Sequence, residues 1–162
     1  MRIAVMSDSH DNIWKLAQAI PHMAEADVIL HCGDLISPFM IVRLVQGVKD
    51  KPIHIVWGNN DGDKRLLSEM AANAGNVKLH GEYALLELEG LKVAINHYPK
   101  VARALAESGK YDLVCYGHDH TAHEEWIGDT LLLNPGELMG MQGRSTIAMY
   151  DSERKTVEFV EV

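Results

Sequence analysis

The chain has 162 residues, a formal net charge of -8 and 47% hydrophobic residues. This length suits one domain spanning residues 1–162, and the composition is that of a globular protein rather than a disordered chain. The acidic balance, without a cluster of Lys and Arg, argues against strong nucleic-acid binding. No apolar run reaches the roughly 18 residues of a membrane span, and the stretch Ile3 to Met6 is too short for a signal peptide, so we expect a cytoplasmic protein without membrane association.

The first half of the chain alternates apolar runs with helical periodicity. The apolar runs predict buried strands at residues 2–7, 27–32 and 51–57. Helices are predicted where apolar residues recur between Ile13 and Ile20, from Pro38 onward because proline suits a first helical turn, and over residues 63–74. This order predicts parallel strands with helices over a face of the sheet.

The second half begins with strand patterns at 83–88 and 91–96, and the Glu89-Gly90 pair between them predicts a hairpin. A helix is predicted over 101–108 and a strand over 111–116. Further runs predict short strands of an antiparallel sheet, at 122–127, 130–134, 145–150 and 156–161. Two sheets packed face to face with helices outside would bury all these runs, which predicts a layered α/β sandwich.

The two cysteines, Cys32 and Cys115, lie far apart in the sequence and form no CxxC motif. This spacing indicates neither a zinc knuckle nor a redox motif. We expect two reduced thiols buried in strands, since unpaired cysteine behaves as a small hydrophobic residue.

Five of the predicted strands end in short polar motifs. These are Asp8-Ser9-His10, Gly33-Asp34, Gly58-Asn59-Asn60-Asp61, Asn96-His97 and Gly117-His118-Asp119-His120. Ligand sites in α/β sheets form outside the carboxyl ends of strands, so the motifs are predicted to converge on one crevice. The glycines before Asp34, Asn59 and His118 would let the backbone approach a bound ion closely.

These motifs offer carboxylate, amide and imidazole ligands without a thiolate. Such a set suits Mn²⁺, Fe²⁺, Zn²⁺, Ni²⁺ or Co²⁺ better than copper. The candidate metal ligands are Asp8, His10, Asp34, Asn59, His97, His118 and His120. Seven ligands exceed the four of a structural zinc site, so we expect two divalent ions that share a carboxylate, with Mn²⁺ as the first choice.

In this order, the motifs DxH, GD, GNxD, a histidine at a strand end and GHxH resemble those of the calcineurin-like metallophosphoesterase superfamily along the whole chain. GNND and Asn134-Pro135-Gly136-Glu137 are similar to the small single-domain phosphodiesterases of archaea and bacteria. That branch also includes a eukaryotic trafficking subunit. The resemblance implies an α/β fold that is a four-layer αββα sandwich of two mixed sheets flanked by helices.

The resemblance also implies how the ligands are divided. The first ion would be held by Asp8, His10, Asp34 and His120, and the second by Asp34, Asn59, His97 and His118, with Asp34 bridging. Two ions about 3.5 to 4 Å apart lower the pKa of a bridging water, and the hydroxide is the expected nucleophile for phosphodiester hydrolysis. Asn59, Asn60 and His118 are the predicted catalytic residues.

Two departures from the family pattern affect the expected chemistry. Many members carry a histidine that is thought to protonate the leaving oxygen where this chain has Asn60, and an amide cannot act as a general acid. We therefore hypothesise that the protein favours diesters with good leaving groups, or that a water on a metal supplies the proton. His97-Tyr98-Pro99 replaces the HGH run common in the branch, which predicts a different loop near the second ion.

Several other polar residues have competing interpretations. Asp61 is expected to stabilise a turn or orient ligands rather than to contact substrate, and His31 either orients Asp34 or fills the core. We interpret four histidines without sequence partners as surface or satisfied core residues, namely His22, His54, His80 and His123. We interpret three basic residues as solvated charges rather than phosphate contacts, namely Lys64, Arg65 and Arg144.

Three apolar residues follow the NPGE turn, namely Leu138, Met139 and Met141. They either fill the core or form a contact in a homo-oligomer, because exposed apolar patches mark interfaces.

The main alternative function is a non-catalytic protein-interaction scaffold on the same fold. A scaffold of this kind would carry residues unable to bind a metal at some ligand positions, whereas every matched position here holds a residue able to bind one. A structural metal site is a third possibility and would have a closed coordination shell. The surplus of ligands around a shared Asp34 favours an enzyme acting on a small phosphodiester.

Overall fold

Parallel strands alternating with helices form the first sheet of the protein. The computed structural model describes all 162 residues. Sheet A has the order β11-β10-β1-β2-β3-β4, comprising β1 (Arg2–Met6), β2 (Val28–His31), β3 (Ile53–Ile55), β4 (Val77–Leu79), β10 (Thr146–Asp151) and β11 (Thr156–Glu161). Strands β1 to β4 are parallel, and β10 pairs antiparallel with β1. The sheet is therefore mixed.

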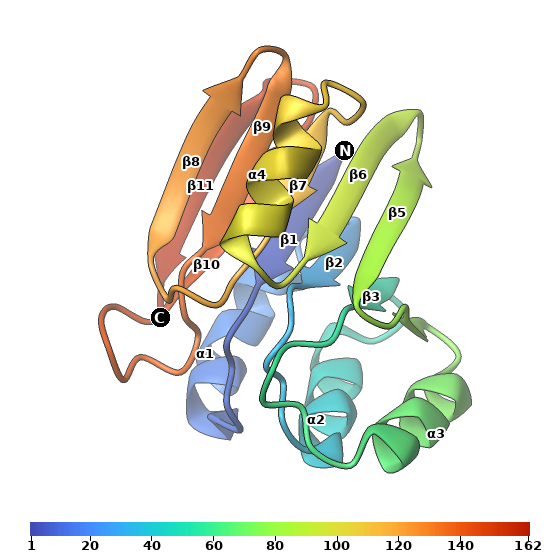
Figure 1. The fold of residues 1–162 in the computed structure, drawn as a ribbon. Helices are drawn as coiled ribbons and strands as arrows, with labels where there is room; N and C mark the ends of the chain where they lie inside the picture. The colour runs from blue at the N-terminus through green and yellow to red at the C-terminus, as the bar shows by residue number, and fades with distance from the viewer.

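The second sheet, sheet B, lies face to face with the first (Figure 1). Its order is β5-β6-β7-β9-β8, comprising β5 (Tyr83–Leu88), β6 (Leu91–Asn96), β7 (Leu113–Cys115), β8 (Ala122–Ile127) and β9 (Thr130–Pro135). The three central strands are parallel, and the edge strands β5 and β8 are antiparallel to their neighbours. Glu89 and Gly90, with φ of 49° and 85°, form the tight turn between β5 and β6.

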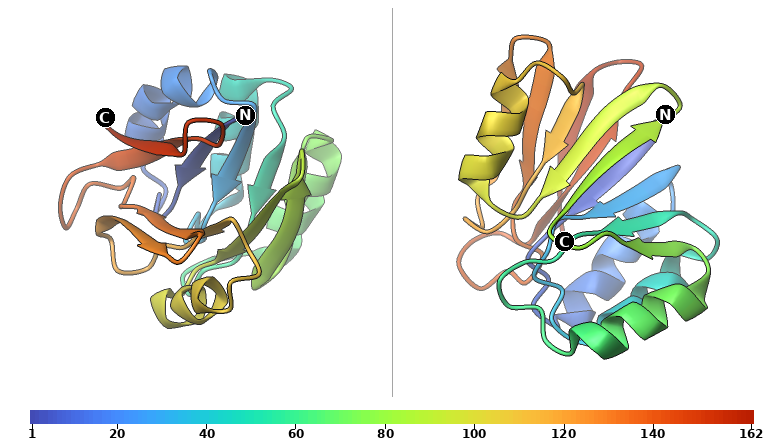
Figure 2. Two further views of the ribbon diagram at one scale, coloured as in Figure 1. Left: turned by 90° about the horizontal axis from the view of Figure 1, so that it is seen from above. Right: turned by 45° about the vertical axis from the view of Figure 1, so that its right-hand side comes forward.

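Helices cover the two outer faces unequally (Figure 2). Sheet A carries α1 (Ile13–Met23), α2 (Pro38–Val48) and α3 (Lys64–Ala74), whereas sheet B carries only α4 (Pro99–Glu107). The first turns of α1 and α3 are capped by Asn12 and Asp63, whose side chains accept hydrogen bonds from the backbone N–H groups of Lys15 and Leu66. All four helices are too short to cross a lipid bilayer.

The apolar side chains form three layers between these elements. In β1, Ala4 and Met6 pack against the helices of sheet A, whereas Ile3 and Val5 point into the space between the sheets. All four are fully buried, as expected for a strand with both faces covered. Burial of each large aliphatic side chain contributes about 1.5 to 3 kcal/mol, so this double-sided packing fixes the strand positions. The four-layer αββα prediction is confirmed.

The pairing of the last four strands differs from the sequence prediction. We expected one antiparallel sheet, but β8 and β9 belong to sheet B, whereas β10 and β11 extend sheet A beside β1. Hydrophobic periodicity identifies a strand and its buried face without identifying its partner. The free side of β1 accepts β10, five of whose six residues are buried.

The structure also corrects the bounds of several elements. It adds β4, a strand of three residues that the sequence did not predict because Val77 and Leu79 are its only apolar residues. Helix α4 begins at Pro99 rather than at residue 101, since proline occupies its first turn. The third predicted strand contracts from residues 51–57 to Ile53–Ile55.

The structure shows the surroundings of both cysteines and of two histidines that have no partner nearby in the sequence. Cys32 and Cys115 are free, buried thiols between the sheets, as predicted, although Cys32 follows β2 rather than lying in a strand. Burial, and then the neighbouring Cys115, raises the pKa of Cys32 well above its usual range. His54 Nδ1 lies 2.8 Å from His80 Nε2, so these residues are hydrogen-bonded partners. Burial, and then the charges of His80 and Lys78, lower the pKa of His54 to about 4.

This histidine pair makes stability depend on pH. Because the pKa of His54 is lower in the folded state than the ordinary value of about 6.5, its contribution is complete above pH ~6.5 and is lost as the pH falls toward 4. His54→Gln should reduce the fall in Tm between pH 7 and pH 5, measured by circular dichroism in EDTA. The exposed His22→Gln is the control, and equal pH slopes for the two variants would contradict the assignment.

Candidate metal centre

The five polar motifs lie at the carboxyl ends of neighbouring strands, as predicted. Those after β1, β2 and β3 belong to sheet A, and those after β6 and β7 belong to sheet B. Five candidate ligand residues have left-handed backbone conformations, namely Asp8 (φ 51°), His10 (40°), Asp34 (57°), His118 (77°) and His120 (58°). Such values are uncommon for residues other than glycine and cost free energy, so the surrounding contacts must hold these loops.

One group of ligands gathers around Asp8. Its Oδ1 atom lies 3.4 Å from His120 Nε2 and 3.9 Å from His10 Nε2. Asp8 and Asp34 are buried, and His10 Nε2 is also 3.5 Å from Asp34 Oδ2. Three potential ligands of one ion are thus brought together, and Asp34 lies beside them.

A second group extends from Asp34 to the loops of sheet B. His97 Nε2 lies 3.6 Å from Asp34 Oδ2 and 3.0 Å from Asn59 Oδ1. The same amide oxygen of Asn59 lies 2.9 Å from His118 Nδ1. Asp34 therefore lies between the two groups, where a shared ligand would have to be.

Hydrogen bonds fix which nitrogens of two histidines face the carboxyl groups. His97 Nδ1 donates to the carbonyl oxygen of Cys32 at 2.8 Å, and His120 Nδ1 donates to Glu137 Oε2 at 2.8 Å. The Nε2 atoms of both rings face Asp34 and Asp8, and a neutral histidine that carries its proton on Nδ1 offers the Nε2 lone pair to a metal. Lone pairs that face carboxylate oxygens repel one another, and a cation between them removes that repulsion.

Two unpartnered polar atoms point to the same chemistry. Asp8 Oδ1 and His10 Nε2 are buried and form no hydrogen bond. Buried polar atoms are rarely left unpaired, and those in native structures often mark an ion site. The donor set and these two atoms fit divalent metal ions.

Burial and close contacts shift the pKa values of Asp8 and His10. Burial raises the pKa of the Asp8 carboxyl, but interactions with His10 and Ser7 and the backbone N–H of His118 outweigh it, and the pKa is lowered overall. The Asp8 carboxylate in turn raises the pKa of His10, with a further contribution from Asp34. At 3.9 Å, His10 Nε2 and Asp8 Oδ1 attract each other electrostatically rather than through a hydrogen bond.

Asn60 contacts Asp34 directly. Its backbone N–H donates to Asp34 Oδ1 at 2.8 Å, and its side-chain Nδ2 donates to Oδ2 at 2.7 Å. Glycine is required beside this contact, because a Cβ at Gly58 would overlap Asp34 Oδ1. Asn60 therefore orients the carboxylate that lies between the two ligand groups.

Asp61 holds the loops after β2 and β3 together. Its Oδ1 atom accepts the N–H groups of Leu35 (2.8 Å) and Ile36 (2.9 Å), and its Oδ2 atom accepts those of Gly58 (2.6 Å) and Asp34 (3.3 Å). The predicted turn and orienting role of Asp61 is confirmed.

Glu137 is a residue of the centre that the sequence did not assign. It is fully buried, binds His120 through Oε2 and accepts the N–H groups of Gln142 and Gly143 through Oε1. A carboxylate behind a metal-binding histidine fixes the ring and raises its basicity. The available signal was an acidic residue two positions after a strand in the NPGE motif, but its partner becomes visible only in three dimensions.

His31 forms hydrogen bonds with the loops after β1 and β2. Its Nδ1 atom accepts the N–H of Gly33, and its Nε2 atom lies 3.1 Å from Ser9 Oγ. Complete burial lowers its pKa to about 4, so the ring is neutral. His31 thus connects the loops that carry Asp8 and Asp34 rather than contacting Asp34 itself.

The remaining sequence candidates belong to neither ligand group. Lys64 lies 5.2 Å from the centre of the Trp57 ring, whereas Arg65 and Arg144 pair with Glu69 and Glu161 on the surface, as expected for solvated charges. His123 lies 3.3 Å from Glu125. Leu138 is core, as one alternative held, and of the three apolar residues after NPGE only Met141 is exposed, at 84%.

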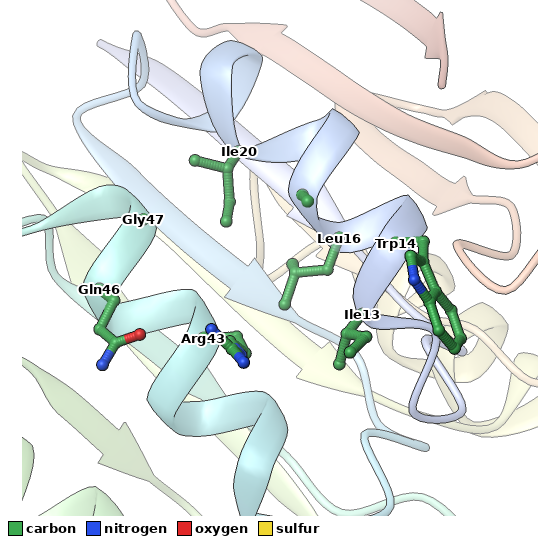
Figure 3. A pocket seen from close by; sticks show the side chains of 8 residues that line it. Ile13, Trp14, Leu16, Ile20, Arg43, Gln46 and Gly47 are labelled. Atoms are coloured by element: carbon green, nitrogen blue, oxygen red, sulfur yellow. The ribbon is translucent and has the colours of Figure 1, made fainter.

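The surface cavities differ in whether a candidate ligand lines them. A groove of about 410 Å³ between α1 and α2 is lined by Ile13, Leu16, Arg43 and Gln46 among others, but by none of the candidate ligands (Figure 3). A smaller pocket of about 250 Å³ opens beside His120, with Thr121, Gln142 and Arg144 also in its wall. The smaller pocket therefore adjoins a candidate metal ligand, His120.

Aspartates, histidines and an asparagine gathered at strand ends of an αββα sandwich define the metallophosphoesterase class. The calcineurin-like phosphoesterase superfamily domain matches residues 1–155, and the chain belongs to this family.

Relatives agree with this assignment. Phosphodiesterase MJ0936 from Methanocaldococcus jannaschii is 34% identical over 160 residues, covering 96% of this chain and 95% of its own length. The solved structure of a novel archaeal phosphodiesterase matches with a TM-score of 0.92 and 32% identity over 100% of both chains. A single mutant of Vps29 from Entamoeba histolytica, at 15% identity and a TM-score of 0.70 over 100% of this chain and 99% of its own, shares the fold.

The four hydrogen bonds of Asp61 lead to a prediction about stability. Asp61→Ala should lower the free energy of unfolding by about 2 to 4 kcal/mol, because it leaves several backbone N–H groups without their acceptor. Asp63→Ala is the control, since it removes a single helix cap and should cost about 1 kcal/mol. Urea denaturation of the metal-free proteins measures both, and equal losses would contradict the role of Asp61.

Proposed function

We propose that the protein is a metal-dependent phosphodiesterase that uses two divalent ions. The observation that carries the proposal is the position of Asp34 Oδ2, which lies 3.5 Å from His10 Nε2 in one ligand group and 3.6 Å from His97 Nε2 in the other. Asp8 Oδ1 lies 3.4 Å from His120 Nε2, and Asp8 belongs to both clusters of possible metal ligands in the structure. The similarity to a protein named phosphodiesterase over nearly the whole chain supports the choice of diesters.

The ligand assignment follows the two groups. The first ion would be held by Asp8, His10, Asp34 and His120, and the second by Asp34, Asn59, His97 and His118. When bound, two such ions supply an activated water at neutral pH and neutralise the charge that develops on phosphate oxygens. Mn²⁺ is our first choice, and Ni²⁺, Fe²⁺, Zn²⁺ and Co²⁺ suit the same donors.

The surrounding residues position this chemistry. Asn60 holds both oxygens of Asp34, and Glu137 and the Cys32 carbonyl hold the rings of His120 and His97. The pocket beside His120 would receive one arm of the diester, where Thr121 and Gln142 offer hydrogen-bonding groups. Since preorganised donors need not move during the reaction, these contacts favour turnover.

The leaving group receives no proton from position 60. The Asn60 amide is engaged with Asp34, and an amide does not ionise near neutral pH. We therefore propose small diesters with good leaving groups as substrates.

A protein-interaction scaffold remains the second candidate, because Vps29 chains share the fold. The complete set of ligand residues favours an enzyme over a scaffold. The cytoplasmic location stays a prediction.

A metal reconstitution experiment tests the function. The protein is stripped of metal, reloaded with one divalent ion at a time, and assayed with bis-p-nitrophenyl phosphate and p-nitrophenyl phosphate. We expect hydrolysis of the diester that depends on the ion and is greatest with Mn²⁺. Binding of metal without hydrolysis of either ester would favour the scaffold instead.

Asp34 provides the sharpest test of the shared ligand. Asp34→Ala should reduce bound metal from two equivalents to fewer than one and lower diesterase activity by more than about a hundredfold, since even the partners of metal ligands can contribute that much. Plasma emission spectrometry measures the metal. Asp119→Asn, which keeps the oxygen that bonds Asn134, is the control and should retain both ions. Two equivalents in Asp34→Ala would exclude the bridging role.

Asn60→His tests the missing acid. A histidine there should make kcat/KM depend less steeply on the pKa of the leaving group across substituted phenyl diesters, because the ring can donate a proton. Asn60→Gln, which cannot donate an acidic proton, is the control and should keep the wild-type dependence. Identical slopes in all three proteins would contradict the hypothesis.

A further inference from the structure

Strand β5 forms an open edge of sheet B. It pairs on one side with β6, in the register from Tyr83↔Asn96 to Leu88↔Leu91, and no strand lies on its other side (Figure 1). The backbone groups of residues 83–88 form no hydrogen bonds beyond this ladder. An edge of this kind is a template for pairing with another chain.

The hairpin turn determines which backbone groups face outward. Glu89 and Gly90 both have positive φ, as in a two-residue type I′ turn, so Leu88 and Leu91 form the closing hydrogen-bonded pair. Hydrogen-bonded and non-hydrogen-bonded pairs alternate in an antiparallel ladder. The N–H and C=O groups of Tyr83, Leu85 and Glu87 therefore point away from β6.

The side chains of these same three residues lie on the uncovered outer face. Ala84, Leu86 and Leu88 turn toward the core between the sheets, whereas Tyr83 is 60% exposed and Leu85 is 53% exposed. Helix α4 packs on the central strands β6, β7 and β9. Strand β5 thus combines a free backbone edge with an exposed apolar face.

The other edges are protected in ways that β5 is not. Strand β4 has only three residues, and β11 exposes Glu158 and Glu161. Strand β8 carries Glu124 and Glu125, the latter paired with Arg103. Short edge strands and charged side chains prevent edge pairing, and β5 has a single charge, Glu87. The exposed apolar residues on β5 are consistent with an edge that another chain covers.

We propose that β5 pairs antiparallel with β5 of a second copy of this chain, about a two-fold axis at Leu85, so that the two five-stranded sheets become one. This register places Leu85 opposite Leu85 of the second copy and Tyr83 opposite Glu87 of the second copy. In this register all three outward-facing residues pair with residues of the partner strand. If the two-fold axis passed through Leu86 instead, Tyr83 would lie opposite Glu89, which belongs to the turn. The strand is complementary to itself in backbone and side chains.

The side-chain pairs explain why the occupant is a second copy. The two Leu85 side chains would cover each other, and each Tyr83 hydroxyl can donate to a Glu87 carboxylate, so the one charge of the edge gains a partner. Cross-strand pairs of these kinds stabilise antiparallel strand pairing. The dimer does not depend on the proposed phosphodiesterase activity.

Sedimentation velocity over a concentration series tests the dimer. Wild-type protein should sediment as a dimer at high concentration, and Leu85→Lys should raise the dissociation constant at least about tenfold, because two like charges would meet at the axis. Trp126→Lys is the control, since Trp126 lies on the opposite edge of the same sheet at 42% exposure and should leave the dimer intact. A monomeric wild type, or a Leu85→Lys dimer as tight as the wild type, would overturn the proposal.

Cysteine cross-linking tests the register. In Leu85→Cys the two Cα atoms would be about 5.5 Å apart, within disulfide range, whereas in Tyr83→Cys they would be offset by four residues, about 13 Å. Under mild oxidation, Leu85→Cys should form a cross-linked dimer and Tyr83→Cys should not, although Tyr83 is the more exposed. The native Cys32 and Cys115 are buried and do not interfere. Equal cross-linking of both variants, or none of Leu85→Cys, would contradict this register.

Discussion

The crowding of buried carboxyl groups and imidazole nitrogens in the centre is the constraint on which the site depends. Asp8 and Asp34 are buried, and the Nδ1 atoms of His97 and His120 donate hydrogen bonds away from them, so each ring turns its Nε2 atom toward a carboxyl group. Burial strengthens such electrostatic effects, because little water is present to screen them. The fold therefore gathers metal-binding groups whose charge a divalent cation would balance, and the chain belongs to a family of phosphoesterases.

Hydrogen bonds from neighbouring side chains stabilise the strained backbone at the ligand positions. Left-handed conformations at non-glycine residues such as Asp8, Asp34 and His118 cost roughly 1 to 3 kcal/mol each. Asp61 opposes this cost for the Asp34 loop with four backbone hydrogen bonds, and His31 connects the loops after β1 and β2. Both are polar residues with no direct metal role, so the stability of the loops and the positions of the ligands depend on the same bonds.

The sequence predicted the parts of this protein that depend on local pattern. Apolar runs and strand-end motifs were sufficient for the β1 to β3 region and for the gathering of the ligand residues, because the carboxyl ends of parallel strands share an edge. It did not predict that β10 pairs with β1, since periodicity does not identify a partner strand. Glu137 was missed for a related reason: its contact with His120 joins residues that belong to different loops.

The division of the ligands between the sheets has a mechanical consequence. Asp8, His10, Asp34 and Asn59 follow strands of sheet A, whereas His97, His118 and His120 follow strands of sheet B. Under the proposed assignment each ion binds residues from both sheets, so sliding of one sheet over the other would break coordination bonds as well as apolar contacts. Metal binding would then hold the two sheets in fixed positions, and the availability of metal would govern the rigidity of the whole sandwich rather than of the loops alone.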